Sequence, residues 1–483
     1  MGAQVIDILI RGDRVVTANG VGAWDIAVAG EKILSVAAPG TVKDADAGRV
    51  IDARGKIVIP GGIDPHIHCK FGQPGGHVSA LPDQVSRAAL FGGTTTLLDF
   101  AQWAPGETLQ QSIEKRDADC WRGQCYSDYG FHILLTGKIP QETVEQLPEA
   151  IQAGYPSVKI FTTEVRPERS NWRLDYGDIW EVLQQLGKHN GIACIHAEDN
   201  DLVMHMYEKM IRAGRVGFEH MAEVHSSLSE DLSYRRVIRL AENVERAALY
   251  LMHTSARTGI EAIAESRARG FPIYGETLHQ YIMFSSEDYK RPNGQMYHTY
   301  PSLKTKDDHK AMWEGMDNGS ISSVATDGLC TPFAVKVSGK RIDDTVGGNA
   351  GVEPRIAVMY TEMVVNRGYP LELLVDVTAA NAAKIFGLYP RKGVIAAGSD
   401  ADIVVLDPAL ARTLSKEDLH ESDYTPWEGY RVAAMPQITL LRGKIVAEDG
   451  RFLGDLKHGR SLQRKIGDAI LDGPAASPRA PVA

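Results

Sequence analysis

The middle of the chain alternates between short apolar runs and helical patterns, and this alternation constrains the fold more than any other feature. Eight runs have the length and composition of strands buried on both faces. Helical patterns lie between several of them, most clearly over residues 176–189, 228–244 and 260–269. Eight parallel strands alternating with helices predict an α/β fold of the (β/α)8 TIM-like barrel type. The expected strands are Ile57–Ile63, Thr94–Phe100, Tyr129–Leu135, Ser157–Phe161, Ile192–His196, Ala248–His253, Pro272–Gly275 and Ile321–Thr326.

The alternative to a barrel is a doubly wound open sheet. No glycine-rich phosphate loop follows the first strand, which disfavours the nucleotide-binding form of that fold.

Both ends of the chain show only strand patterns, separated by glycine and asparagine as in hairpins. They predict a small β-sandwich domain built from residues 1–55 and 392–454, with residues 56–391 forming the barrel. Residues 455–483 are expected to form a C-terminal arm that ends in a disordered tail over 473–481. The arm carries a basic patch, predicted to be a solvated face or a subunit contact. The expected terminal strands are 6–12, 14–17, 24–28, 32–36, 401–407 and 439–446, and the basic patch is Lys457, Arg460, Arg464 and Lys465.

Charge and cysteine usage exclude several classes of protein. The net charge of −10 argues against a nucleic-acid-binding surface. No run reaches the ~18 uninterrupted apolar residues of a membrane span, and the first residues do not resemble a signal peptide. The five cysteines have no disulfide spacing, which predicts free thiols in a cytoplasmic protein.

Two histidines one residue apart, His66 and His68, follow the first expected barrel strand. Side chains two residues apart on an extended segment face the same way, so the pair could bind one divalent cation. Two hydrogen-bonded histidines in a turn are an equally good explanation of the pair alone. The other strands add further candidates, because in a barrel the carboxyl ends of all strands meet at one mouth. These candidates are Lys159, His196, His253 and Asp327.

Each candidate alone has an ordinary structural explanation, such as a buried histidine or a capping aspartate. Six polar groups at the same end of five strands are harder to explain by packing, because burying them without partners is costly. Lys159 is unusual because a protonated amine repels cations. Burial would favour its neutral form, which can react with carbon dioxide to give a carbamate that bridges two metals. A lysine whose amine extends to the barrel mouth is the alternative.

Several motifs, in the same order along the chain, resemble the amidohydrolase superfamily and within it the hydantoinase/dihydropyrimidinase family. The matching stretches are Pro60–His68, Phe91–Phe100, Val158–Phe161, His196–Glu198, Gly275–Thr277, Thr326–Asp327 and Lys392–Asp402. The resemblance implies a binuclear metal centre, usually zinc, with His66, His68 and Asp327 on one metal. It places His196 and His253 on the other, with carboxylated Lys159 and a hydroxide as bridges.

The resemblance also implies the reaction. The bridging hydroxide would attack a C–N amide bond, with a cyclic amide such as a hydantoin, dihydropyrimidine, imide or related ureide as the expected substrate. Asp327 would carry the proton to the leaving nitrogen. A linear amide or carbamate is the alternative substrate, and a non-catalytic binding protein is the alternative function. The family is commonly a cytosolic homotetramer, with a homodimer as the alternative, and residues 423–465 resemble its subunit-contacting segment.

Four positions depart from the family pattern and are the candidate substrate-binding residues. Glu164 occupies the place of a tyrosine that stabilises the oxyanion, and Tyr300 occupies the place of a substrate-binding serine. Tyr300 is the first candidate to supply the missing phenol, and it is therefore a candidate catalytic residue beside Asp327. Tyr155 and Tyr274 are lesser candidates.

Two further departures concern loops at the barrel mouth. Asn349 corresponds to a substrate-facing asparagine but is displaced by two residues. The loop after His68, which contains Lys70, lacks the acidic residue that the family usually has there. Lys70 and His77 add positive charge near the mouth, which suits an anionic substrate.

Overall fold

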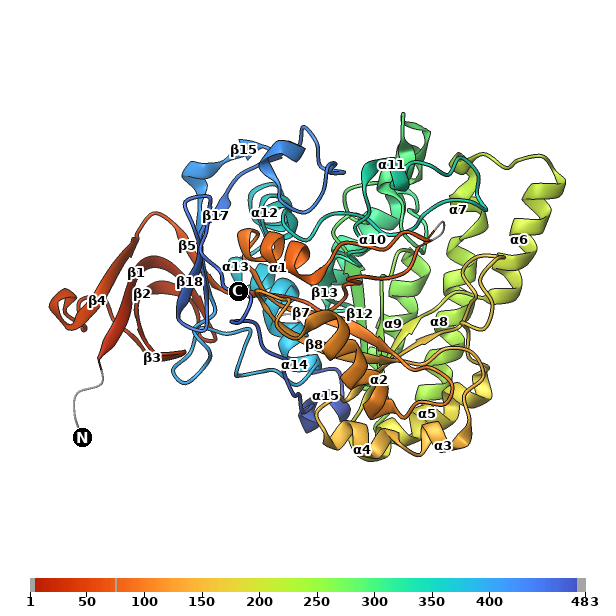
Figure 1. Cartoon of the computed structure of the whole chain (residues 1–483), viewed down its shortest axis with the longest axis horizontal. Coiled ribbons are helices and arrows are strands. Elements are labelled where there is room, and N and C mark those ends of the chain that lie inside the picture. The colour runs from red at the N-terminus through yellow and green to blue at the C-terminus, as the bar shows by residue number, and fades with distance from the viewer. Residues whose placement is uncertain (1–4, 74–75, 476–483) are drawn as a thin grey trace.

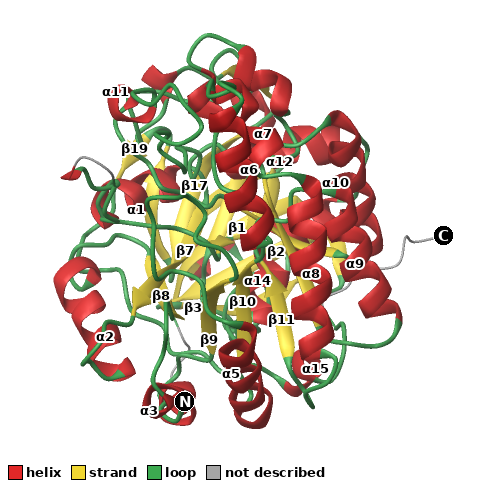
Figure 2. Ribbon diagram, turned by 90° about the vertical axis from the view of Figure 1, so that its right-hand side faces the viewer, coloured by secondary structure: helices red, strands yellow, loops and turns green. Residues whose placement is uncertain are grey.

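The larger sheet has eight parallel strands and forms the predicted barrel. We describe residues 5–73 and 76–475 of a computed structural model, shown in Figures 1 and 2. The strands neighbour one another in chain order, without the reversal that defines a doubly wound sheet, so the open-sheet alternative is wrong. The strands are β6 (Gly62–Asp64), β7 (Thr94–Gln102), β8 (Asp128–Leu134), β9 (Ser157–Phe161), β10 (Ile192–His196), β11 (Ala248–Leu251), β12 (Ile273–Leu278) and β13 (Ile321–Ala325).

Backbone contacts just beyond the strand ends bring the first and last strands of the barrel together. Ile67 and Gly328 form a parallel bridge, and the His68 amide donates to the Gly328 carbonyl at 2.7 Å. The segment after β6 therefore lies directly beside the segment after β13. Two stretches that are about 260 residues apart in sequence meet at the carboxyl mouth, where sites of this fold form.

Helices surround the strands (Figure 2), as the (β/α)8 arrangement requires. The predicted helix over 176–189 is confirmed residue for residue, and those expected at 228–244 and 260–269 are present with shifted ends. The helix expected at 260–269 begins three residues earlier, at Arg257, because the Arg257 N–H donates a hydrogen bond to Asp308 Oδ1 at 2.8 Å. The longer helices that cover the barrel are α1 (Pro82–Phe91), α2 (Leu109–Arg116), α5 (Tyr176–His189), α6 (Asn200–Arg212), α8 (Ser227–Ala241), α9 (Arg257–Ala268) and α10 (Lys306–Asn318).

The second large sheet combines both ends of the chain and is mostly antiparallel. Figure 1 shows its red N-terminal and blue C-terminal strands side by side, away from the barrel helices. The run 57–63 is not one barrel strand as expected: Ile57–Pro60 pairs with this sheet, and only Gly62–Asp64 enters the barrel. The strands are β1 (Ile6–Thr17), β2 (Gly20–Ala29), β3 (Lys32–Ala37), β4 (Ala47–Ala53), β5 (Ile57–Pro60), β14 (Ile403–Asp407), β17 (Met435–Leu441), β18 (Lys444–Glu448) and β19 (Arg451–Phe452).

The first two expected strands, 6–12 and 14–17, are one strand. Its pairing with β2 shifts register between Gly12 and Val15, so the Arg-Gly-Asp segment is a bulge and not a turn. The exact division of the chain into domains at 55/56, 391/392 and 454/455 stays a prediction.

The segment after residue 455 packs against the barrel of its own chain, at the end opposite the mouth. Leu462 N–H donates to the Tyr129 carbonyl at 2.8 Å, near the start of β8, and Leu462, Ile466 and Ile470 join the apolar cluster inside the barrel. The expectation of a solvated basic patch is wrong for Arg464, which is buried and donates to Ser157 Oγ at 2.9 Å. Residues 476–481 of the expected tail lie outside the described residues.

The structure bears on two predictions made from the composition, one about the cysteines and one about membrane spans. All five cysteines are buried and free, so the expected free thiols are confirmed. Within residues 5–73 and 76–475, no helix is both long enough and apolar enough to cross a membrane.

A buried lysine joins the two sheets. Lys392 Nζ lies 2.8 Å from Asp128 Oδ2, at the start of barrel strand β8, and 2.7 Å from Asp402 Oδ2, next to β14. Asp400 Oδ2 is 3.1 Å away, and the Lys392 side chain is 1% exposed. Lys392 thus contacts three carboxylates at the junction between the barrel and the small sheet, and it is joined there by Arg442 on Asp128 and by Lys32 on Asp400.

We expect Lys392→Met to lower the free energy of unfolding by about 3–5 kcal/mol, because the buried carboxylates lose the cation that they share. Lys32→Met is the matched control, since Lys32 pairs with Asp400 at 2.7 Å but is half exposed. Lys32→Met should lower the free energy of unfolding, measured by urea denaturation, by about 0–1 kcal/mol. Equal losses in the two variants would contradict the role given to the buried cluster.

Candidate metal and active site

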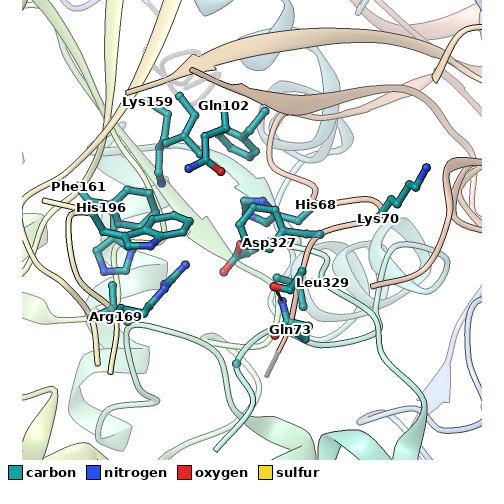
Figure 3. Close-up of a pocket in the computed structure, with 18 of the residues that line it drawn as sticks. His68, Lys70, Gln73, Gln102, Lys159, Phe161, Arg169, His196, Asp327 and Leu329 are labelled. Carbon is teal, nitrogen blue, oxygen red and sulfur yellow. Dashed lines mark hydrogen bonds and ion pairs between the residues drawn. The ribbon is translucent and has the colours of Figure 1, made fainter. Parts of the chain in front are cut away.

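One cavity of about 820 Å³ at the carboxyl mouth of the barrel brings all six predicted metal ligands together. In Figure 3, Lys159 and His196 lie on one side of this cavity, and His68 and Asp327 lie on the other. The six side chains come from the ends of five strands: His66 and His68 follow β6, Lys159 lies on β9, His196 ends β10, His253 follows β11 and Asp327 follows β13.

His66, His68 and Asp327 form the tightest group. Each offers one ligand atom, and these atoms lie within 4.8 Å of one another. The Nε2 atoms of both histidines are 3.1 Å from Asp327 Oδ1. Asp327 Oδ2 points to another partner and accepts a hydrogen bond from Thr299 Oγ1 at 2.8 Å. Two imidazoles and a carboxylate at this spacing fit one divalent cation.

Glu276 on β12 orients His66. Its Oε1 lies 2.8 Å from His66 Nδ1 and accepts the His253 backbone N–H at 3.0 Å. Tyr250 donates to Oε2 of the same carboxylate at 2.9 Å. A carboxylate behind a histidine fixes the ring tautomer and directs the other nitrogen to a metal. Sequence reasoning gave Glu276 no role, although it lies in one of the matching motifs.

His196, His253 and Lys159 form the other half of the group. The His196 and His253 ring centroids are 4.4 Å apart, and those of His253 and His66 are 5.4 Å apart. Lys159 Nζ lies 2.9 Å from the sulfur of Met252, a weak acceptor. Burial lowers the pKa of Lys159 to about 8, against the opposing effect of Asp327 and Glu276, so a neutral amine is accessible.

The protonation states also suit metal binding. Burial lowers the pKa of His196 to about 4 and that of His253 well below its usual value, so both rings are neutral at pH 7. Burial acts to raise the pKa of Asp327, but His66 and His68 outweigh it and lower the pKa to about 2. Among the described residues, His68 Nδ1 and His253 Nδ1 are buried without a hydrogen-bond partner. Neutral imidazoles beside an ionised carboxylate are the donor set that a divalent metal centre needs.

Two of these residues have unusual backbone conformations. His253 and Asp327 have φ values of 42° and 49°, in the left-handed region that non-glycine residues seldom adopt. Such conformations cost about 1–3 kcal/mol each and concentrate at functional sites. The turn after each strand is thus shaped to direct a polar side chain into the cavity.

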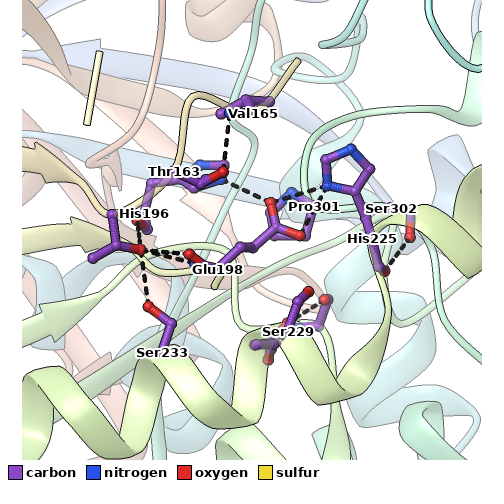
Figure 4. Close-up of polar contacts among 12 residues, drawn as sticks. Thr163, Val165, His196, Glu198, His225, Ser229, Ser233, Pro301 and Ser302 are labelled. Atoms are coloured by element: carbon purple, nitrogen blue, oxygen red, sulfur yellow. Dashed lines mark hydrogen bonds and ion pairs between the residues drawn. The ribbon is translucent and has the colours of Figure 1, made fainter. Parts of the chain in front are cut away.

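A buried hydrogen-bond network supports His196. Figure 4 shows Glu198 between His196 and His225, with its carboxylate 3.0 Å from His196 Nε2 and 2.9 Å from His225 Nδ1. Tyr207 OH lies 3.0 Å from His225 Nε2. Because Glu198 engages Nε2 of His196, Nδ1 is the nitrogen left for a metal. His225 lies 27 residues from Glu198 in a connecting segment, and nothing in the sequence signals this pairing.

The candidate substrate residues divide into two groups. Tyr300 and Lys70 line the cavity, although the Lys70 amine turns away from its centre and donates to the Asp119 carbonyl at 3.1 Å (Figure 3). Glu164 and Asn349 are not among the lining residues. Glu164 accepts the Trp172 backbone N–H at 2.8 Å, and Asn349 is fully buried. Their role in substrate binding stays a prediction.

The lesser phenol candidates, Tyr155 and Tyr274, also lie outside the lining. Tyr274 bonds to the Ile470 carbonyl in the C-terminal segment, at the opposite end of the barrel.

Comparison with known proteins agrees with this geometry. The amidohydrolase family profile matches residues 57–446. D-hydantoinase from Geobacillus stearothermophilus is 32% identical over 477 residues, which cover 96% of this chain and 98% of the relative. D-hydantoinase from Streptomyces coelicolor is 32% identical over 463 residues, with 94% and 97% covered.

Solved structures of hydantoinases and dihydropyrimidinases superpose on this chain over nearly its whole length. Dihydropyrimidinase from Brevibacillus agri NCHU1002 superposes with a TM-score of 0.89 at 30% identity, covering 95% of this chain and 98% of the other. L-hydantoinase (dihydropyrimidinase) from Arthrobacter aurescens gives a TM-score of 0.85 at 25% identity, covering 95% and 100%.

The site and the fold together define a metal-dependent amidohydrolase. Within that class, the chain belongs to the hydantoinase/dihydropyrimidinase family of the amidohydrolase superfamily. Membership implies a centre of two divalent metal ions, and the donor set described above fits one.

The orientation of His66 by Glu276 can be tested through metal affinity. We expect Glu276→Gln to weaken metal binding by about 10- to 100-fold, as loss of a partner behind a metal ligand commonly does. Competition with a chelator measures this affinity. Tyr250→Phe is the matched control, because it removes one hydrogen bond to Glu276 but keeps the carboxylate. Unchanged affinity in Glu276→Gln would show that the carboxylate does not orient the ligand.

Proposed function

We propose that this protein hydrolyses a C–N bond in a cyclic amide, such as a hydantoin, dihydropyrimidine, imide or related ureide. The observation that carries the proposal is the convergence of His66, His68, Lys159, His196, His253 and Asp327 in one cavity. The relatives named above as hydantoinases and dihydropyrimidinases support the choice of a cyclic substrate. The presence of all six residues argues against the alternative of a non-catalytic binding protein.

Asp327 is the proposed proton carrier. Two divalent ions, when bound, would lower the pKa of a water molecule and polarise the substrate carbonyl. Asp327 faces the cavity, and its carboxylate is ionised at neutral pH. It can therefore accept the proton of the attacking water and deliver it to the ring nitrogen as the C–N bond breaks. Thr299, bonded to Oδ2, holds the carboxylate in place for both steps.

Tyr300 is the proposed donor to the substrate oxygen. Its ring packs 4.4 Å from that of His298 and 5.0 Å from that of His225, so its position is fixed. Burial, against the opposing charge of Arg166, raises the pKa of Tyr300 to about 12, and the phenol keeps its proton at neutral pH. A protonated phenol can donate to negative charge developing on the carbonyl oxygen.

We further propose zinc as the metal, a carboxylated Lys159 as a bridge, and a homotetramer, with a homodimer as the alternative. The buried, readily neutralised amine of Lys159 supports carboxylation. Five free, buried cysteines support a cytoplasmic location. For the assembly, exposed apolar side chains on the outer helices, among them Leu228 and Leu232 on α8, support a contact between subunits.

Carboxylation of Lys159 can be observed directly. Metal-loaded protein equilibrated with 13C-labelled bicarbonate should show a carbamate carbon resonance in NMR. Lys159→Arg keeps the positive charge but should lose the resonance. A wild-type spectrum without it, in protein that has bound metal, would contradict the proposed bridge.

Ring opening is the direct test of the proposed function. Metal-loaded protein incubated with hydantoins, dihydropyrimidines, cyclic imides, linear amides and carbamates should add one water to the cyclic compounds, as detected by mass spectrometry. Asp327→Asn should lower kcat by about 10³-fold or more, because a neutral amide cannot carry the proton. Asp468→Asn, at an exposed position on the short helix α15 (Asp468–Leu471), should leave kcat unchanged. Turnover of linear compounds alone would contradict the cyclic assignment.

A further inference from the structure

One cation in the wall of the cavity, Arg169, has neither an acidic partner nor any other hydrogen-bond acceptor for its side chain among the described residues. Three of the cations that line the cavity form ion pairs with nearby carboxylates. Arg169 lines the same cavity. Among residues 5–73 and 76–475 it forms no ion pair, and its guanidinium has no hydrogen-bond acceptor. The pairs of the others are Lys115 with Glu107, Arg116 with Asp99, and Arg166 with Glu168.

Arg169 is held in place by an aromatic side chain. Its guanidinium carbon lies 3.6 Å from the centroid of the Trp172 ring, so the cation stacks on the indole face. Trp172 is itself packed edge-on against Phe161, with centroids 5.3 Å apart. A guanidinium stacked in this way keeps its edge N–H groups available for a planar acceptor. Figure 3 shows Arg169 extending toward the cavity from the side of His196.

Glu164 anchors the loop that carries this pair. Its Oε2 accepts the Trp172 backbone N–H at 2.8 Å, and its own N–H donates to Asn200 Oδ1 at 3.0 Å. The residue that departs from the family's tyrosine therefore fixes the Arg169–Trp172 loop. The change at Glu164 and the unpaired cation are parts of one local arrangement.

The position of Arg169 costs free energy that a ligand could recover. Burial, and then the charge of Arg166, lower the pKa of Arg169 to about 10, so it remains protonated at neutral pH. A partly buried cation with unused donors is stabilised most by an anion that accepts two parallel hydrogen bonds. Carboxylate has this geometry.

We propose that Arg169 binds a carboxylate on the substrate, so that the substrate is a cyclic amide with an anionic side group. This inference rests on the proposed function and names its substrate class. Trp172, Phe71 and Phe161 provide an apolar wall beside the cation, suited to the ring or to the linker between ring and carboxylate. In the reaction, the oxygen of one water forms a bond to the carbonyl carbon, the ring C–N bond breaks, and the nitrogen gains a proton from that water. The side carboxylate is unchanged.

A matched pair of substrates tests the inference. Hydantoin-5-acetic acid and hydantoin-5-acetamide have nearly the same shape and differ in charge. We expect wild-type kcat/KM to be about 10-fold or more higher for the acid, the lower end for a charge-assisted hydrogen bond. Arg169→Met should lower kcat/KM for the acid by about 30- to 100-fold and change that for the amide by less than about 3-fold. Arg169→Lys should retain part of the preference for the acid, because lysine keeps the positive charge but lacks the paired N–H donors of a guanidinium.

Arg173→Met is the control for the loop, since Arg173 pairs with Asp175 and does not line the cavity. It should leave both substrates unaffected, and Tm should confirm that all variants fold. Equal kcat/KM for acid and amide in the wild type would overturn the inference. An equal loss for both in Arg169→Met would also overturn it and place Arg169 at the reacting carbonyl.

Failure of the proposed function can be distinguished from failure of the inference about Arg169. If neither ring is opened, the cyclic amide assignment is wrong, and binding of the two compounds measured by calorimetry decides the inference. Tighter binding of the acid that is lost in Arg169→Met would support it. Equal binding, or none, would overturn it.

Discussion

The cost of burying polar side chains at the carboxyl mouth of the barrel is the constraint on which the rest of the site depends. Three imidazoles, a carboxylate and an amine are almost entirely withdrawn from water there, with His68 only slightly exposed. Such groups are stable when they are paired, hydrogen-bonded or bound to a metal. Glu276 and Glu198 satisfy one nitrogen on each of two histidines and leave the other directed inward. The pair of divalent ions that family membership implies would complete the arrangement.

The fold supplies the precision that such a site needs. Parallel strands bring segments distant in sequence to one mouth, and the bridge between Ile67 and Gly328 fixes the first candidate metal-binding segment against the last. At the junction of the two sheets, Lys392 binds carboxylates of both. The positive φ values of His253 and Asp327 indicate that packing elsewhere stabilises strained turns at the site. The stability of the whole chain thus maintains the geometry of a few side chains.

Much of this could be predicted from the sequence, and the remainder could not for physical reasons. Buried parallel strands are nearly continuous apolar runs, so the barrel and the gathering of the six strand-end side chains at its mouth were predictable. The assignment of Ile57–Pro60 to the small sheet was not, because an apolar run does not identify its partner strands. Arg169 and His225 lie in irregular segments, where no periodicity relates position to direction. Their roles emerge only from the contacts with Trp172 and Glu198.

Metal stoichiometry shows whether these six side chains hold two divalent metal ions. Elemental mass spectrometry of the purified chain, together with a protein concentration from amino-acid analysis, gives the number of ions per chain. We expect about two divalent ions in the wild type and a clear loss in a His196→Asn, His253→Asn double variant that remains folded. A wild-type chain that binds no divalent ion after incubation with zinc, or a double variant with the full content, would contradict this expectation.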